Sequence, residues 1–332
     1  MASTALPENC DRTVEVIVVN WNGRRLLADC LEGLNKQQYG PFSVTLVDNG
    51  SEDGSVRFVA QNYPEIQIIA LPENKGFCAA NNMALKKTRA DYVALLNNDA
   101  IPDPQWIKNL VYALERHPQA GFAASKMVFY DAPGTVDRAG DAYTRAGTGL
   151  LRGRGEPEKL YDQKEWVFGA CAGAALYRRK MLEDIGLFDE DFFLLYEDVD
   201  LSFRAQLKGY RCLYVPNARV YHRSSSSIVH DSALSVYYSH RNLEWVYIKN
   251  MPRPLILKTL LPHLVYNLAA MVFFLIKGKG GVYLKAKIDA LKKIKAMLNK
   301  RGKIQSQKSA LYPYIWHLME KESFINRLKR RH

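Results

Sequence analysis

Polar side chains follow a buried apolar run near the middle of the chain. Residues 92–96 are apolar or small and predict a buried strand, and the run ends at Asn97, Asn98 and Asp99. In open α/β sheets, ligands bind at the carboxyl ends of the strands. Oxygen ligands at that edge suit Mg²⁺ or Mn²⁺, with substrate phosphates completing the coordination shell. Alternatively, Asp99 only caps the proline-containing turn that follows it.

A second acidic cluster lies in the other half of the chain. Glu197, Asp198 and Asp200 follow the apolar run 192–196. Mutual repulsion and partial burial would raise the pKa of at least one of these carboxyl groups. Acids also suit the first turn of a helix because of its macrodipole, and this structural explanation stays open for each single carboxylate. The preceding small-residue stretch, 166–175, allows close approach of backbone or ligand.

A histidine ends what the sequence predicts to be a last pair of strands, residues 209–216 and 218–222. The neutral imidazole of His222 suits Mn²⁺, although a histidine at this point can equally be a surface residue. A serine run, 224–227, follows Arg223. We expect this loop to order over a bound diphosphate, with Arg223 on a phosphate oxygen.

Strands and helices that alternate must position these side chains. Apolar runs predict strands at residues 14–20, 44–47, 66–71 and from 92 onward, separated by helices at 24–34, 55–62 and 78–87. This alternation is typical of a parallel sheet with right-handed crossovers. It places Asp48, Asn74 and Asp99 along one sheet edge. A dinucleotide-binding Rossmann fold is the rival, but Asn-Trp-Asn-Gly follows the first strand in place of GxGxxG.

Four motifs in chain order carry a family resemblance: residues 16–22, 47–51, 74–77 and 95–99. The series resembles glycosyltransferase family 2, and most of all its bacterial rhamnosyltransferase-like subgroup, over roughly residues 14–250. The implied fold class is α/β of the GT-A type. It has a Rossmann-like, mostly parallel sheet flanked by helices, and a C-terminal helical membrane-associating extension follows it here.

The resemblance implies a nucleotide-sugar site made of seven residues: Asn20, Asn22, Asp48, Asn74, Gly76, Asn98 and Asp99. Asp48 would hold the pyrimidine and ribose, and the turn at Asn74 would approach the nucleotide. The Asp-x-Asp metal motif of the family falls on Asn97-Asn98-Asp99, so only Asp99 carries a charge toward Mn²⁺ or Mg²⁺. Affinity for the cation should therefore be weak without the diphosphate. His222 matches a histidine that completes the metal shell in several family members.

The resemblance also implies that the Glu-Asp motif supplies the catalytic base, at Asp198. Transfer to an alcohol needs a carboxylate within reach of the acceptor hydroxyl, opposite the leaving diphosphate, whose charge the metal stabilises. One base and no separate nucleophile predict a single displacement that inverts the anomeric centre. Glu197 and Trp166 are expected on the acceptor side, together with Phe193. Residues 131–164 are expected to form a loop-rich insertion near that cleft.

Composition fits a globular protein of one large domain or two small ones, with 48% hydrophobic residues. The five scattered cysteines suit a reducing cytosol, and the N-terminus does not resemble a signal peptide. Charge is concentrated at the C-terminal end. From Lys277 onward there are 16 of the 46 basic residues and only three of the 34 acids. This basic tail is expected to determine which anionic surface the protein meets.

The prolines of residues 251–254 predict a boundary between a catalytic domain, 1–250, and a basic, partly apolar helical tail, 251–332. Residues 255–276 are mostly apolar, but Pro262 is expected to split them into pieces too short for the ~20 residues of a membrane span. An interfacial or re-entrant segment is the preferred interpretation. Residues 283–298 predict one basic amphipathic helix, suited either to an anionic membrane surface or to packing on the catalytic body.

We therefore expect an inverting, metal-dependent glycosyltransferase at the cytoplasmic face of the membrane, peripherally attached to it. Its donor would be a dTDP- or UDP-sugar, with dTDP-rhamnose suggested by the subgroup, and its acceptor a glycan or lipid-linked glycan. A nucleotide-sugar-binding scaffold without turnover is the alternative, prompted by the missing first Asp of the metal motif. No nucleic-acid partner is expected, because the tail's charges alternate with a continuous apolar face.

Overall fold

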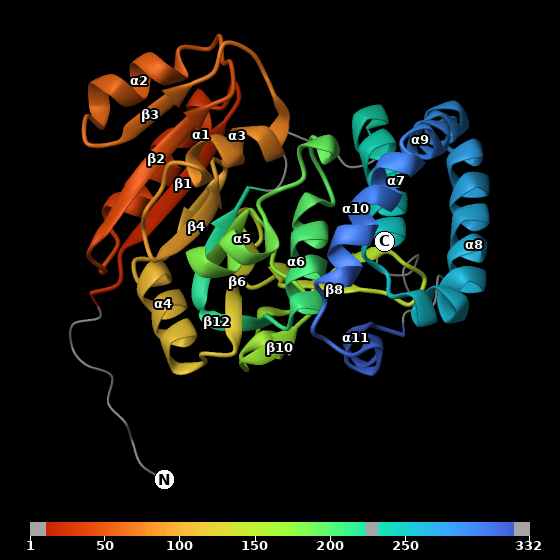
Figure 1. Ribbon diagram of the computed structural model, residues 1–332. Coiled ribbons are helices and arrows are strands. Elements are labelled where there is room, and N and C mark those ends of the chain that lie inside the picture. The colour runs from red at the N-terminus through yellow and green to blue at the C-terminus, as the bar shows by residue number, and fades with distance from the viewer. Residues whose placement is uncertain (1–10, 224–231, 322–332) are drawn as a thin grey trace.

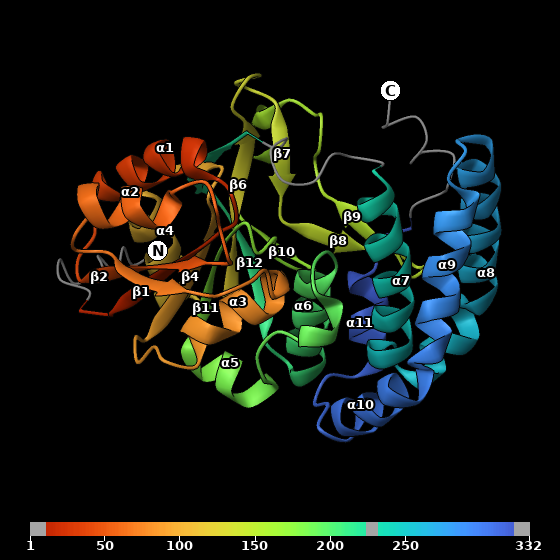
Figure 2. The same cartoon turned by 90° about the horizontal axis from the view of Figure 1, so that it is seen from above.

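The computed structural model describes residues 11–223 and 232–321. A central sheet with helices on both faces lies beside a group of C-terminal helices (Figure 1). Seen from above, the sheet and the helical group sit side by side, with α6 between them (Figure 2).

The first half of the sheet is parallel, as the sequence predicted. Its strands are β1 (Val14–Asn20), β2 (Phe42–Asp48), β3 (Gln67–Ala70) and β4 (Tyr92–Asn97), in the spatial order β3-β2-β1-β4. The connecting helices are α1 (Arg24–Asn35), α2 (Ser55–Asn62) and α3 (Gly76–Leu85). Successive side chains of β1 alternate between two apolar clusters. Val16 and Val18 pack toward α1, and Ile17 lies on the opposite face with α3.

The second half makes the sheet mixed rather than mostly parallel. It contains β5 (Ala100–Pro102), β6 (Ala120–Phe129), β7 (Val136–Ala139), β10 (Glu165–Val167), β11 (Ala174–Arg178) and β12 (Arg211–His222). Only the β6–β12 pair is parallel there, and β11 runs antiparallel to both β4 and β6. No α-helix separates β6 from β11 along the chain, so these strands lack the helical crossover that usually accompanies parallel pairing.

The predicted last pair of strands is wrong, because β12 is one strand of 12 residues. Its register against β6 shifts between Val215 and Arg219, on either side of Pro216. Proline lacks the backbone N–H that a regular ladder uses, so the chain bulges there and then continues in the same direction.

The insertion expected at residues 131–164 has more structure than a loop. Besides β7 it forms a two-stranded sheet of β8 (Asp141–Tyr143) and β9 (Gly149–Leu151), then a 3₁₀ turn, η1 (Glu158–Tyr161). The remaining elements of this body are α4 (Trp106–Arg116), α5 (Arg179–Ile185), η2 (Glu190–Phe192) and α6 (Glu197–Lys208).

The C-terminal helices are α7 (Ala233–Asn250), α8 (Arg253–Ile276), α9 (Gly280–Lys292), α10 (Ile294–Ser306) and α11 (Tyr312–Leu318). Two predictions fail here. Pro262 does not split α8, because a proline removes one hydrogen bond and packing holds the helix on both sides of it. Thr259 contacts Tyr247 of α7, and Phe274 packs on Tyr283 of α9. The single helix expected at residues 283–298 is two helices. The chain turns at Lys293, which lets α10 pack on α6 and α7.

These helices share the apolar cluster of the sheet, since Met297 and Ile315 are buried in it together with Trp245 of α7. The predicted division at residue 250 stays a prediction.

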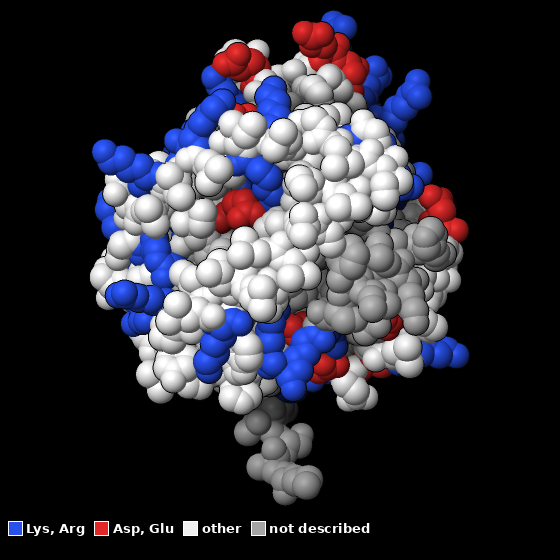
Figure 3. All heavy atoms as spheres, turned by 90° about the vertical axis from the view of Figure 1, so that its right-hand side faces the viewer, with Lys and Arg blue, Asp and Glu red and all other residues white. Residues whose placement is uncertain are grey.

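The outer side of this helical group is apolar. We call it the outer apolar face, and it consists of exposed side chains of α8, α9 and α10: Leu257, Leu261, Leu264, Val265, Leu268, Val272, Leu275, Ile276, Leu284, Ile288, Leu291, Ile294 and Leu298. Figure 3 views the molecule from this side, where a broad uncharged area has Lys and Arg side chains around it.

Candidate functional site

The carboxyl ends of three parallel strands bring Asn20, Asp48 and Asn98 together. Asn20, at the end of the middle strand β1, donates from Nδ2 to Asp48 Oδ1 at 3.0 Å. Its own Oδ1 accepts from Asn98 Nδ2 at 2.8 Å. All three side chains are buried. The register opposes Asn20 to Asp48, so the parallel pairing predicted from the sequence is what makes this contact possible.

The turn after β3 is built around Asn74. Its Oδ1 accepts from the backbone N–H of Gly76 and from Asn49 Nδ2, both at 2.9 Å. Gly76 has a φ of +84°, and a Cβ placed there would lie 2.5 Å from the Phe193 ring. Only glycine satisfies both demands. The turn is therefore fixed and is packed against the segment that precedes the acidic cluster.

Asn22 shapes the neighbouring turn after β1. It has a φ of +50°, and its Oδ1 accepts from the backbone N–H of Glu52 at 2.9 Å. Its backbone N–H donates to Ser51 Oγ at 2.8 Å. The two turns after β1 and β2 are thus joined to one another at the sheet edge.

Asp99 and His222 meet because β5 pairs antiparallel with the end of β12, which opposes Ala100 to His222. His222 donates from Nε2 to Asp99 Oδ1 at 3.1 Å and from Nδ1 to Asp137 Oδ2 at 2.7 Å. Burial would lower the pKa of His222, but these two carboxylates raise it to about 9. Asp137 is also paired with Arg154. Asp137 was not predicted from the sequence.

Asp99 and His222 fit a cation that takes most of its ligands from the substrate diphosphate and from water. In residues 11–223 and 232–321, no group of three His, Cys, Asp or Glu side chains is arranged to hold a metal. Asp99 and His222 do converge, and Asp137 orients the imidazole through its other nitrogen, as outer carboxylates do in metal sites. To bind a cation, His222 would give up its Nε2 proton. Together with Asp99 it would then leave positions for diphosphate and water, which suits Mg²⁺ or Mn²⁺.

Glu197 and Asp198 lie buried in the first turn of α6, where the helix dipole favours negative charge. Asp198 accepts from the backbone N–H groups of Val199 at 2.8 Å and of Ala172 at 3.4 Å. Glu197 Oε2 is buried without a hydrogen-bond partner among the described residues. Burial, and then repulsion from Asp198, raise the pKa of Glu197 to about 8. The predicted pKa rise within this cluster is confirmed.

An arginine from β7 joins this pair to a further acid. Arg138 Nη1 lies 3.2 Å from Asp141 Oδ1 and 3.9 Å from Asp198 Oδ2. Burial raises the pKa of Asp141 to about 7, although Arg138 opposes the rise. The sequence predicted that this region lies near the acceptor cleft but assigned no role to Arg138 or Asp141. Residues 136–142 carry no clear strand signal that could have found them, because Asp137 and Arg138 are adjacent and the charged residues do not alternate with apolar ones.

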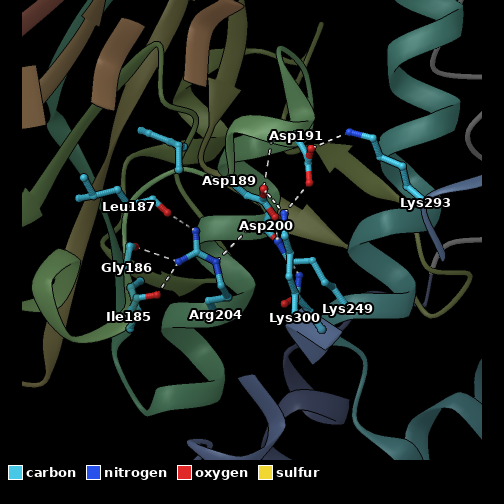
Figure 4. Close-up of polar contacts among 12 residues, drawn as sticks. Ile185, Gly186, Leu187, Asp189, Asp191, Asp200, Arg204, Lys249, Lys293 and Lys300 are labelled. Atoms are coloured by element: carbon cyan, nitrogen blue, oxygen red, sulfur yellow. Dashed lines mark hydrogen bonds and ion pairs between the residues drawn. The ribbon is translucent and has the colours of Figure 1, made fainter. Parts of the chain in front are cut away.

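Asp200 does not belong with the other two acids. It accepts from Arg204 Nε at 2.9 Å, Lys249 Nζ at 2.9 Å and Asn250 Nδ2 at 2.7 Å, as Figure 4 shows for the two cations. Burial would raise its pKa, but Lys249 and Arg204 outweigh this and lower it. Because a helix turns by about 100° per residue, acids at positions 198 and 200 point to different sides. Asp200 is therefore a structural link between α6 and α7.

Trp166 is not brought near His222. It lies opposite Leu213 on β12, about 30 Å along that strand from His222 at the usual rise per residue. Its ring packs 3.8 Å from the guanidinium of Arg211. Phe193, by contrast, lies beside Gly76 and stacks on Tyr238 with ring centroids 5.3 Å apart.

The serine run at 224–227 lies outside the described residues. Arg223, just before it, donates its backbone N–H to the Asp99 carbonyl at 3.0 Å, and its guanidinium pairs with Asp29.

Replacement of Glu197 by Gln should change how stability depends on pH. The folded-state pKa of Glu197, about 8, lies above the unfolded value of about 4.3, so ionisation costs the folded state stability as pH rises between the two. Gln does not ionise. The melting temperature of Glu197→Gln relative to the wild type should therefore increase from pH 5 to pH 8, measured by thermal denaturation. Glu190→Gln is the control, because the pKa of Glu190 is lowered by the Asn82 hydrogen bond. Equal pH profiles for Glu197→Gln and the wild type would contradict the assignment.

Comparison with known proteins gives consistent results. The family model for glycosyl transferase family 2 matches residues 15–186. The chain is 29% identical over 254 residues to the N-acetylglucosaminyl-diphospho-decaprenol L-rhamnosyltransferase of Mycobacterium tuberculosis, which covers 68% of this chain and 81% of that protein.

Solved structures with the same fold include two bound to nucleotide-sugars. One is the mannosyltransferase PcManGT from Pyrobaculum calidifontis with GDP-Man and Mn²⁺ (TM-score 0.54, 19% identity, 92% of this chain and 82% of that one). The other is TarS 1–349 of S. aureus with UDP-GlcNAc (TM-score 0.57, 18% identity, 89% and 90%).

Proposed function

The chain belongs to glycosyl transferase family 2 and is a glycosyltransferase with a GT-A fold, and we propose that it is an inverting, metal-dependent enzyme. It moves a sugar from a pyrimidine nucleotide-sugar to a glycan or lipid-linked acceptor in cell-surface polysaccharide synthesis. Rhamnose carried by dTDP is the favoured donor, because the Mycobacterium tuberculosis relative is named as a rhamnosyltransferase acting on a lipid diphosphate sugar. A UDP-sugar is the other donor to test.

The observation that carries this proposal is the shared sheet edge of Asp48 and Asp99, joined through Asn20 and Asn98. Asp48 is buried and held at the end of β2, where it can accept hydrogen bonds from a base and a ribose. Asp99 and His222 lie where a diphosphate-bound cation would sit. A bound Mn²⁺ or Mg²⁺ would stabilise the charge that develops on the leaving diphosphate.

The residues of α6 then supply the proton transfer. Asp198 is fixed by two backbone N–H groups, and Arg138 lies 3.9 Å away, so the carboxylate is oriented. We assign it as the general base that takes the acceptor hydroxyl proton. With Asp198 as the base and no second nucleophile assigned, the acceptor oxygen attacks the sugar directly and the anomeric centre inverts. Glu197, protonated near neutral pH, can donate to the acceptor or the donor sugar.

A panel of nucleotide-sugars in a thermal-shift assay, with and without Mn²⁺, tests the donor assignment. A ligand that binds only the folded state stabilises it by about 2.7 kcal/mol at a hundred times its Kd. We expect one dTDP- or UDP-sugar to raise the melting temperature, and Mn²⁺ to enlarge the rise. No shift with any nucleotide-sugar would contradict the proposed function, and a shift without turnover on any acceptor would favour the scaffold hypothesis.

Two substitutions should separate the binding of the metal by Asp99 from the orientation of its histidine ligand, His222. Asp99→Asn is expected to remove the response to Mn²⁺, because it removes the charged ligand. Asp137→Asn leaves Asp99 in place but weakens the orientation of His222, so the Mn²⁺ concentration for half-maximal activity should rise about 10–100-fold. Asp184→Asn, on a surface ion pair with Lys208, is the control. Equal activity of the wild type in EDTA and in Mn²⁺ would rule out the metal requirement.

The partner of the outer apolar face is proposed to be an anionic lipid surface at the cytoplasmic side of the membrane. Among the described helices, α8 is long and apolar enough to cross a membrane. Only 22% of its most apolar 18-residue stretch is buried inside the protein. A face of exposed leucines surrounded by lysines is complementary to acyl chains bordered by anionic headgroups.

Polar contacts on the inner side of α8 favour lying on the membrane over crossing it. His263 contacts Glu244 of α7 at 3.0 Å and the Ala146 carbonyl at 2.9 Å. Lys287 of α9 donates to Glu244 at 2.6 Å and to Asn267 of α8 at 2.6 Å. Crossing the bilayer would separate these groups from their partners at a cost of several kcal/mol. His263 and Asn267, two of the residues that interrupt the apolar run, thus face the protein.

A further inference from the structure

A short strained segment leads into the catalytic acids. Phe193, Leu195 and Tyr196 have φ values of +66°, +63° and +70°. At Phe193, with ψ at −62°, the backbone N–H of Leu194 donates to the carbonyl of Phe192 at 2.8 Å, which is a γ-turn of the strained form. Non-glycine residues in such conformations cost on the order of 1–3 kcal/mol each, so surrounding structure must hold them.

Helix α7 supplies much of that support. Asn242 is fully buried, and its Nδ2 lies 2.7–3.0 Å from the carbonyl oxygens of Phe192, Leu194 and Leu195. The neighbouring Arg241 donates from Nη2 to the carbonyl of Phe192 at 2.9 Å and to that of Asp191 at 3.1 Å. Each of these donors stabilises the bent backbone at the point where it departs from ordinary geometry.

Lysines of the helical group hold the two ends of the same segment. Lys249 of α7 lies 2.5 Å from Asp189 and 2.9 Å from Asp200, and it is buried between them (Figure 4). Lys300 of α10 contacts Asp189 at 2.5 Å and Asp191 at 2.7 Å. The segment between residues 189 and 200, which contains both catalytic acids, is therefore clamped from outside the sheet.

We propose that Asn242 is a positioning residue: it holds the strained segment 192–196 so that Asp198 faces the acceptor hydroxyl. This inference rests on the proposed function, because Asp198 is the base there. The segment also touches the nucleotide side, since Cys78 donates its backbone N–H to the Phe193 carbonyl at 3.3 Å. The γ-turn thus fixes the distance between the turn at Asn74 and the start of α6. The residues that hold it lie on α7, beyond the 15–186 match to the family model.

Asn242→Asp tests the proposal, because it keeps the shape of the side chain and replaces its donor by an acceptor. Three carbonyls would then face an oxygen, and the γ-turn should relax. A displacement of the base by about 1 Å costs about 100-fold in rate. We therefore expect kcat to fall about 100-fold, while the Kd for the nucleotide-sugar, measured by calorimetry, changes less than twofold. Asn242→Ser, which keeps one donor, should recover part of kcat and guards against misfolding of Asn242→Asp.

Asn109→Asp is the matched control, since Asn109 donates to the carbonyl of Asn217 at 2.7 Å on the far side of the sheet. It should leave kcat unchanged. A kcat for Asn242→Asp within threefold of the wild type would overturn the inference and leave the proposed function intact. So would a loss in which kcat, Kd and melting temperature change together without recovery in Asn242→Ser. A wild-type protein without turnover would overturn both.

Discussion

Asp198→Asn is expected to lower kcat by about 10²–10⁴-fold, the usual contribution of a general base. The amide keeps the size of the side chain, and its carbonyl oxygen can keep the shorter contact, with the backbone N–H of Val199, while the longer one with Ala172 is lost. It cannot accept the proton of the acceptor hydroxyl. Nucleotide-sugar binding should stay nearly unchanged, because Asp48 lies at the end of β2 and Asp99 in the turn after β4, and neither is on α6.

The measurement is transfer at saturating donor, together with the Kd for the nucleotide-sugar from calorimetry. Asp184→Asn, the same chemical change at a surface ion pair, should leave both quantities as they are in the wild type. If Asp198→Asn loses nucleotide binding, Asp198 is part of the donor site and the base has been assigned wrongly. If it retains full activity, Glu197 becomes the first alternative, because it lies beside Asp198 in the same turn.

A triple substitution on the outer apolar face, Leu261→Glu, Leu264→Glu and Leu268→Glu, is expected to abolish binding to anionic vesicles. Each of these side chains is at least half exposed in the isolated protein, so the substitutions remove no internal contact of consequence. Burying one leucine in lipid contributes about 1.5–3 kcal/mol. Losing three, and adding three negative charges, should reduce vesicle affinity by more than a thousandfold, on the order of 4 kcal/mol or more.

Co-sedimentation with vesicles containing phosphatidylglycerol measures this, with neutral vesicles and raised salt reporting the electrostatic part. Leu160→Glu is the matched control, since Leu160 is 67% exposed in η1, outside the outer apolar face. Unchanged binding of the triple variant would remove the membrane proposal. Removal of residues 255–332 is a poorer experiment than this triple substitution. It would also take Lys300 away from Asp189 and Asp191.

Local sequence patterns were sufficient to predict the strands and turns of the N-terminal half of the protein. A strand whose residues alternate between two apolar faces, or are buried on both, can be recognised from its own few residues, and so can the polar turn at its end. Parallel pairing then follows from the intervening helices. The position of Asp48 and Asp99 at one sheet edge, with Asn20 between them, could therefore be predicted from the sequence.

The rest of the site depended on strands that pair across long distances. Asp137 and Arg138 sit on β7, whose position is determined by pairing with β6 rather than by any helix–strand alternation. Asp141 lies within reach of Arg138 only because β8 follows β7 directly along the chain. Trp166 lies far along β12 from His222 for the same reason, since its strand pairs with the other end of β12. The sequence pattern identifies a strand but contains little that says which neighbour it will choose.

The sequence by itself determined the family, the first four strands along the chain, and which acids are the candidates in the two motifs. Each of these rests on local periodicity or on a short motif. Tertiary structure alone decided which acid of the cluster near residue 198 is structural. It also decided that Asp137 orients His222, and that Asn242 holds the backbone before Asp198. The physical reason is the same in each case. A buried charge or a strained turn is stabilised by partners distant in the chain, and only folding brings those partners within hydrogen-bond distance.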